Sequence, residues 1–285
     1  VISAVTSIRS TSSILRDDEG LDGEWLGRFH SNLYEDAVRL ADSSQGLVRY
    51  LDTAQDTDAT GFSPQDELEA RLAEAEYYLP SLEKGGTSGF DVSEMSASAQ
   101  DLAQRYFKRY AQDAARICEA DILCAIDQDD IDPAVLAVQF DVDIATMLRR
   151  LSVFVGRGQP NQAAGLVICD TSGTFTFRKP AAGFPVPRFG AACPLWPLFS
   201  ALSQPMVPLR TALQMAGRGS PHFTCFAVAH PLQPFGFSAA RAYEATMLIL
   251  PSTQGAASDL RVGTSCRICP ETDCPARREQ SILAE

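Results

Sequence analysis

The sequence changes its hydrophobic pattern once, near residue 155, and this change limits the folds that the chain can adopt. Before that point apolar residues recur every three to four positions, as they do along one face of a helix. After it come short runs rich in β-branched and aromatic residues, among them AGLVICD, GTFTFRK and HFTCFAVAH, separated by turn residues. Helices followed by strands, rather than alternating with them, predict an α+β fold with a mostly antiparallel sheet.

The first half predicts several helices. One should begin at residue 63, because Ser63 is a favourable N-cap and Pro64 a favourable first helical residue, and we expect it to end at Pro80. Residues 94–126 predict one long helix or two, and residues 132–140 and 143–154 predict two short ones.

Three parts of the chain follow from this pattern. Residues 1–20 are rich in Ser and Thr without a clear period, so we expect a poorly ordered lead-in. Residues 21–154 form a helical region, whose long helices are candidates for a dimer contact. Residues 155–285 form a sheet domain, in which GTFTFRK pairs with AGLVICD as a hairpin and LWPLFSAL forms a short helix.

Charge is distributed unevenly over these parts. The net charge is −12, with 29 acidic and 13 basic residues in residues 1–150 but 7 acidic and 11 basic residues in residues 151–285. The acidic half would repel nucleic-acid phosphates, so the mildly basic half is the better host for an anionic ligand.

The chain shows no apolar run of about eighteen residues and no basic-then-apolar signal peptide, so we expect no membrane insertion and a cytoplasmic location. It also begins without Met, which indicates a fragment or a trimmed chain.

Three cysteines near the C-terminus predict a metal centre. Cys266, Cys269 and Cys274 follow the spacing C-x2-C-x4-C, in which the first pair suits zinc and iron–sulfur sites. Cys193 is the candidate for a fourth ligand because it lies in a Pro/Gly-rich loop rather than in a strand. Prolines follow three of the four cysteines, which favours an iron–sulfur cluster over zinc, and disulfides are the further alternative. The other cysteines are expected to be small core residues, namely Cys118, Cys124, Cys169 and Cys225.

Four segments together resemble the short-chain fatty acyl transcriptional regulators, a bacterial family that includes propionate-catabolism and glyoxylate-cycle regulators. These segments are VGTSCRICPETDCPARR, FPVPRFGAACPLWPLFSAL, GTFTFRKPAAGFP and LAVQFDVDIATMLRRLSVF. The resemblance implies a PAS/GAF-like sensor domain over residues 155–285 that ends in a cysteine arm. It also implies that Cys193 completes the ligand set of a 4Fe-4S cluster and that the domain has a pocket for a short-chain acyl-CoA.

The chain departs from this family in two ways. Family members begin with a helix-turn-helix domain, and residues 1–114 show none, so DNA binding would need a domain absent from this chain. Relatives also carry an H-E-x-x-H peptidase-like segment, which the three histidines here, His30, His222 and His230, do not form. The segment LAVQFDVDIATMLRRL imitates a helix-turn-helix, but the aspartates around it favour a structural helical hairpin.

Basic and aromatic residues around one Pro/Gly-rich loop are the candidates for ligand binding. Cationic side chains could hold the phosphates of CoA while apolar rings receive its acyl or pantetheine chain; surface charges and core aromatics are the alternative. These candidates are Arg178, Lys179, Phe184, Arg188, Phe189 and Trp196.

No catalytic constellation is visible, because nothing places a nucleophile beside a base; the two strand histidines are expected to be hydrogen-bonded core residues. We therefore expect a non-enzymatic sensory part of a homodimeric transcription regulator. The alternative is a cluster- or zinc-binding protein that acts through protein–protein contacts without binding DNA.

Overall fold

A computed structural model describes most of the chain, which divides into two compact units, residues 1–62 and 63–285. The described residues are 2–17, 23, 25–38, 40–41, 63–87, 89–127, 131–188, 190–217, 219–233, 237, 241–253, 255–256 and 259–283. None of the helices in these ranges is both long and apolar enough to cross a bilayer.

The first unit is helical where it is described. Helix α1 (Ile2–Asp17) occupies the stretch that we predicted to be a poorly ordered lead-in, so that prediction is wrong. The half-buried residues Ile8, Thr11 and Leu15 recur at helical spacing, and Ser and Thr between them do not prevent a helix. Residues 25–38 and 40–41 are also helical, inside the predicted helical region of residues 21–154.

The second unit begins with α3 (Pro64–Glu74). Ser63 caps it as predicted, since its side chain accepts a hydrogen bond from the Asp66 N–H and Pro64 is the first helical residue. The helix ends six residues before the predicted Pro80, because Glu76 and Tyr77 take left-handed backbone conformations and the Tyr77 N–H closes the last turn on the Leu72 carbonyl at 2.7 Å. Pro80 instead opens a short helix, α4 (Pro80–Glu83).

The remaining helices follow the predicted order. The stretch 94–126 forms two helices, α5 (Ala97–Arg116) and α6 (Glu119–Ile126). Helices α7 (Pro133–Gln139) and α8 (Ile144–Phe154) form the predicted hairpin. Asp132 and Asp143, two of the aspartates that argued against DNA contact, cap these two helices.

A six-stranded sheet follows, with the order β2-β1-β5-β4-β3-β6. The predicted hairpin is β1 (Gly165–Asp170) with β2 (Phe175–Lys179), and the predicted helix is α9 (Pro197–Ser203). The other strands are β3 (Leu209–Met215), β4 (His222–Pro231), β5 (Tyr243–Ser252) and β6 (Leu260–Val262). All neighbours are antiparallel except β3 and β6, which are parallel. The α+β class is thus confirmed.

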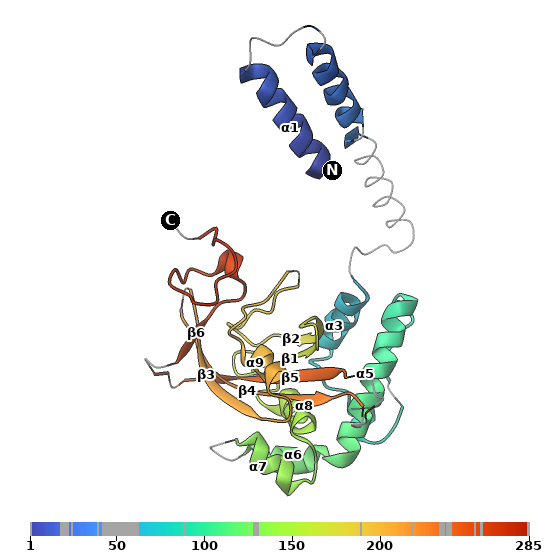
Figure 1. Ribbon diagram of the computed structural model, residues 1–285. Helices are drawn as coiled ribbons and strands as arrows, with labels where there is room; N and C mark the ends of the chain where they lie inside the picture. Colours follow the sequence, from blue (N-terminus) through green and yellow to red (C-terminus); the bar gives the residue numbers. More distant parts are fainter. Residues whose placement is uncertain are drawn as a thin grey trace. The chain divides into compact units, whose positions relative to one another are not determined.

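The sheet is covered on both faces, with α8 and α9 on opposite sides (Figure 1). Successive residues of β5 show this alternation. Leu248 packs with α8 in one core, whereas Met247 and Ile249 pack with α9 in the other. Burial on both faces explains why these strands read as almost continuous apolar runs.

The division between compact units falls between Phe62 and Ser63, not near the predicted residue 154. Helices α5 to α8 share one hydrophobic core with Phe226, Val228 and Leu248 of the sheet. The change of pattern at residue 155 is therefore a change of secondary structure inside one unit.

Candidate functional site

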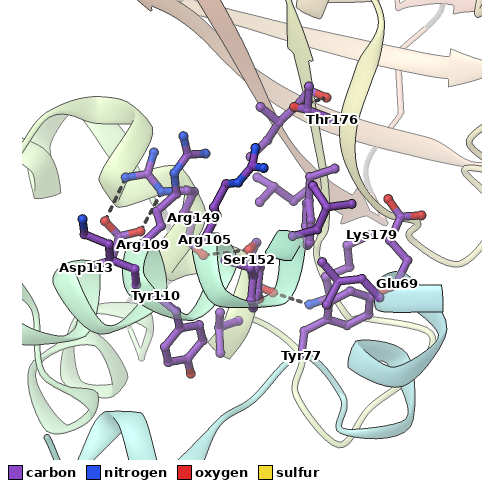
Figure 2. Close-up of a pocket in the computed structure, with 18 of the residues that line it drawn as sticks. Glu69, Tyr77, Arg105, Arg109, Tyr110, Asp113, Arg149, Ser152, Thr176 and Lys179 are labelled. Carbon is purple, nitrogen blue, oxygen red and sulfur yellow. Dashed lines mark hydrogen bonds and ion pairs between the residues drawn. The ribbon is translucent and has the colours of Figure 1, made fainter. Parts of the chain in front are cut away.

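A cavity of about 480 Å³ opens on the helical face of the sheet, among α3, α5, α8 and the β1–β2 hairpin (Figure 2). This size lies within the range typical of small-molecule sites. Its wall is largely apolar, with contributions from each of these elements: Leu68, Leu102, Tyr106, Val153, Leu166, Ile168 and Phe177.

Three basic residues of α5 line the same cavity, Arg105, Lys108 and Arg109. Their spacing of three and four residues places them on one side of the helix. Arg105 and Lys108 are exposed, and neither makes an ion pair or hydrogen bond with any residue that the structure describes. They form a basic mouth above an apolar interior, as an amphipathic anion would require.

Buried ion pairs fix the deeper charged wall. Arg149 donates to both oxygens of Asp113 at 2.6 and 2.8 Å, and Arg150 to both oxygens of Glu83 at 2.8 and 2.9 Å. The two arginines of the helix-turn-helix-like segment are thus engaged inside the unit. Arg150 is 1% exposed, which excludes α8 as a DNA-recognition helix in this fold.

Lys179 is the last residue of β2 and a buried part of the cavity wall, beside Tyr77 and Ser152 (Figure 2). Its Nζ donates a hydrogen bond to the Ser152 carbonyl and lies 5.2 Å from the centre of the Tyr77 ring. Burial lowers the pKa of Lys179 to about 8. Burial also raises the pKa of Tyr77 to about 12, with the charge of Glu69 adding to the effect.

Arg178 and Lys179 are adjacent in sequence but line different cavities. Arg178 pairs with Asp66 at 2.6 Å and with Glu69 at 2.9 Å, and it borders a second, more polar cavity of about 540 Å³. Arg188 and Arg278 line that cavity too, between the β1–β2 turn, α9 and the loop before Cys193. Successive strand side chains point to opposite faces, which accounts for the separation.

The six predicted ligand residues therefore do not form one pocket. Lys179 lines the helical-face cavity, and Arg178 and Arg188 line the polar one. Phe184 and Trp196 are fully buried and pack on each other at 4.9 Å in the core beneath α9, so they are core aromatics. Phe189 lies outside the described residues.

The four predicted metal ligands line one small cavity on the opposite face of the sheet, Cys193, Cys266, Cys269 and Cys274. Two contacts tie the C-terminal arm to the Cys193 loop: the Cys193 N–H donates to the Thr264 carbonyl at 2.9 Å, and the Trp196 indole N–H donates to the Gly263 carbonyl at 3.0 Å. Gly263 is required here, because a Cβ would lie 2.7 Å from the Cys269 sulfur.

Two of these sulfurs differ in how readily they form a thiolate. Burial raises the pKa of Cys193, although the N–H groups of Leu195 and Gly263 face its sulfur and partly offset the effect. Burial also opposes ionisation of Cys266, but hydrogen bonds from Arg278 outweigh it and lower the pKa of that thiol. Within the described ranges, no three side chains of His, Cys, Asp or Glu lie close enough together to hold a metal ion. The four sulfurs thus share a cavity without forming a closed ligand shell.

The other predicted residues have mixed outcomes. Cys169 and Cys225 are buried as expected, whereas Cys118, the N-cap of α6, and Cys124, on α6, are exposed, so the prediction of core positions is wrong for these two. His222 is hydrogen-bonded, with Nδ1 2.7 Å from an Asp259 oxygen. His230 faces Glu244 at 3.9 Å, and burial lowers its pKa.

The C-terminal part of the chain matches a known family of regulators. Residues 164–285 match the family model described as short-chain fatty acyl coenzyme A regulator, C-terminal.

Two curated relatives extend the match. The chain is 26% identical over 200 residues to the HTH-type transcriptional regulator PrpR of Mycobacterium tuberculosis, covering 65% of this chain and 40% of that protein. It is 27% identical over 191 residues to the propionyl-CoA carboxylase regulator of Cereibacter sphaeroides, covering 64% of this chain and 41% of that protein. The matches span about two fifths of each relative's length.

A solved structure of a Mycobacterium tuberculosis transcriptional regulator is similar in fold, with a TM-score of 0.57 at 20% identity. The similarity covers 78% of this chain and 69% of that one.

The basic mouth was not among the residues predicted to bind a ligand. Arg105, Lys108 and Arg109 form a cationic cluster in the otherwise acidic half, in the segment RYFKRY, and that local reversal of charge could have drawn attention to them.

Proposed function

We propose that this chain is the effector-sensing part of a transcription regulator and that its helical-face cavity binds a short-chain acyl-CoA or a ligand of similar chemistry. The observation that carries the proposal is the combination, in one cavity, of an apolar interior with the unpaired cations Arg105 and Lys108 at its mouth. The family description and the relatives' names point to the same ligand class.

The cavity suits such a ligand part by part. An acyl and pantetheine chain is apolar or neutral and would lie along Leu102, Leu166 and Phe177, while phosphates would remain at the basic mouth. The sensor interpretation also has topological support, since the antiparallel order β2-β1-β5-β4-β3 suits a PAS/GAF type of sensor sheet.

Binding can be tested by thermal unfolding of the full chain with propionyl-CoA, free CoA and propionate. The expected result is a rise in melting temperature that is largest for propionyl-CoA, because ligand bound to the native state stabilises it. The double variant Arg105→Gln/Lys108→Gln should reduce the rise, and Lys84→Gln, which alters an exposed lysine outside the cavity, should not. No shift at millimolar propionyl-CoA would overturn the proposed site.

We further propose that Cys193, Cys266, Cys269 and Cys274 hold a 4Fe-4S cluster, with zinc as the second candidate. Support comes from the shared cavity, the N–H groups facing Cys193 and the lowered pKa of Cys266. When bound, a cluster would supply a redox-active group, or zinc a structural staple, between the arm and the Cys193 loop.

Anaerobic purification followed by iron, sulfide and zinc analysis tests the metal proposal. About four iron and four sulfide per chain are expected for a 4Fe-4S centre, and about one zinc for the alternative. Cys193→Ser should lose the metal, whereas Cys225→Ser, a buried cysteine on the same face but outside the cavity, should retain it. Full metal content in Cys193→Ser would remove that residue from the ligand set.

The homodimer stays a prediction. Exposed apolar side chains on the helices of the first unit, including Trp25 and Tyr34, are candidates for the contact. Sedimentation of the full chain and of Trp25→Glu/Tyr34→Glu would test it, with dissociation of the variant as the expected result. DNA binding, in this proposal, belongs to another domain.

A further inference from the structure

The chain has three lysines, and their environments differ sharply. Lys84 and Lys108 are exposed, whereas Lys179 is 7% exposed in the wall of the helical-face cavity. A lysine ammonium is seldom buried unless a carboxylate compensates for the lost hydration.

Among the residues that the structure describes, no carboxylate lies within ion-pair distance of the Lys179 Nζ, and the charge of Glu76 offsets the cost of burial only in part. Its contacts are one backbone carbonyl, that of Ser152, and the face of the Tyr77 ring (Figure 2). Neither contact neutralises a positive charge, and the site therefore favours the uncharged amine.

The uncharged amine is the reactive form of lysine. With a pKa of about 8, roughly a tenth to a fifth of Lys179 is uncharged between pH 7 and 7.4, compared with about one part in a thousand for an ordinary lysine. The hydrogen bond to Ser152 uses one N–H and leaves the nitrogen lone pair available.

We propose that Lys179 is an acylation site, at which an acyl thioester bound in the helical-face cavity transfers its acyl group to Nζ. This inference rests on the proposed function, because the cavity must first bind the thioester. The amine nitrogen forms a bond to the carbonyl carbon, the carbon–sulfur bond breaks, and an amine proton passes to the departing thiolate. The products are an N-acyl lysine and the free thiol of the carrier, with no oxidant or other reactant needed.

The product is compatible with the site. The amide cannot be protonated at neutral pH, so acylation removes the buried charge, and the attached acyl chain fills the apolar interior beside Phe177 and Tyr77. An acylated chain would bind a second acyl thioester more weakly, because that interior is occupied.

The test is incubation of the full chain with propionyl-CoA, followed by intact mass spectrometry and peptide mapping. We expect one added propionyl group at Lys179, formed at least about ten times faster than at Lys84 or Lys108 because more of its amine is uncharged. The rate at Lys179 should rise with pH around 8. Lys84→Arg, which alters an exposed lysine outside the cavity, should retain the adduct, and Lys179→Arg should lose it.

Equal labelling of all three lysines in the parent chain would overturn the inference. Labelling of the other two lysines without labelling of Lys179 would overturn it as well. A thioether analogue of propionyl-CoA separates this result from failure of the proposed function, since the analogue binds but cannot donate its acyl group. A thermal shift with the analogue but no adduct with propionyl-CoA overturns the acylation alone. No shift and no adduct overturn both.

Discussion

The two faces of the sheet carry candidate sites that are built in different ways. The helical-face cavity draws its residues from three helices and a hairpin, and side-chain ion pairs such as Arg150–Glu83 fix its wall. The cysteine cavity draws three of its four sulfurs from nine consecutive residues and is tied together largely by contacts to backbone carbonyls. A site built from a local segment leaves a motif in the sequence, whereas a site assembled from distant elements does not.

The largest expected effect concerns the ion pair on the helical face. Glu83→Gln should lower the free energy of unfolding by about 3–5 kcal/mol, because it leaves the Arg150 charge buried without its partner. Glu83→Gln/Arg150→Met should recover much of that loss. Urea unfolding of both variants measures the effect, and a Glu83→Gln protein as stable as the parent would show that the pair does not support this face.

Lys179 should make stability depend on pH above 8. Its pKa is lowered in the folded state to about 8, from an unfolded value near 10.5, so the unfolded chain binds more protons in between. Stability from this group should therefore rise with pH across that window, by up to roughly 3 kcal/mol. Below pH 8 both states are protonated and the contribution is constant.

Lys179→Met provides the comparison, because it removes the titrating group and keeps the side chain's length. The parent's free energy of unfolding minus that of the variant, measured at pH 7, 8, 9 and 10, should increase as pH rises. A difference that stays constant over this range would contradict the lowered pKa.

On the other face, Gly263→Ala should disrupt the cysteine cavity. The added Cβ would lie 2.7 Å from the Cys269 sulfur, so the arm must shift, at a cost of about 1–3 kcal/mol. Metal analysis should show a loss of binding while propionyl-CoA still raises the melting temperature. Loss of both responses would mean that the two faces are not independent.

The smallest expected effect is at the basic mouth. Removing the exposed charge of Arg105 alone should weaken binding of an acyl-CoA by roughly two- to five-fold, since exposed ion pairs contribute up to about 1 kcal/mol. Titration calorimetry at low and high salt should show that salt reduces the difference between parent and variant. An effect that does not depend on salt would point to packing rather than charge.

Local signals accounted for most of the secondary structure. The Ser63–Pro64 cap, the helical hairpin of α7 and α8 and the β1–β2 hairpin each depend on adjacent residues, and each was predicted. The end of α3 was not, because nothing in EAEYYLP indicates that Glu76 and Tyr77 adopt left-handed conformations. That turn directs the Tyr77 ring toward Lys179 in the helical-face cavity. Because the turn was not predicted, this part of the cavity wall was not predicted either.

Only part of the predicted ligand set lines the helical-face cavity, and the reason is related. Arg178 and Lys179 look equivalent in sequence, but only the folded hairpin shows that one faces Asp66 and the other Ser152. Likewise, Trp196 and Phe184 are suitable in type for an acyl chain, and only tertiary packing assigns them to the core. The partner of a side chain across a hundred residues cannot be read from local pattern.

The alternation of β5 has a consequence for genetic screens. Met247 and Leu248 are consecutive codons, yet one side chain belongs to the core beside the cysteine cavity and the other to the core beside α8. Saturation mutagenesis along this strand should therefore give two interleaved sets of phenotypes, disruption of the α9 core at the odd-numbered positions and of the α8 core at the even-numbered ones. Phenotypes that alternate along this stretch would show genetically which residues of β5 face each side of the sheet.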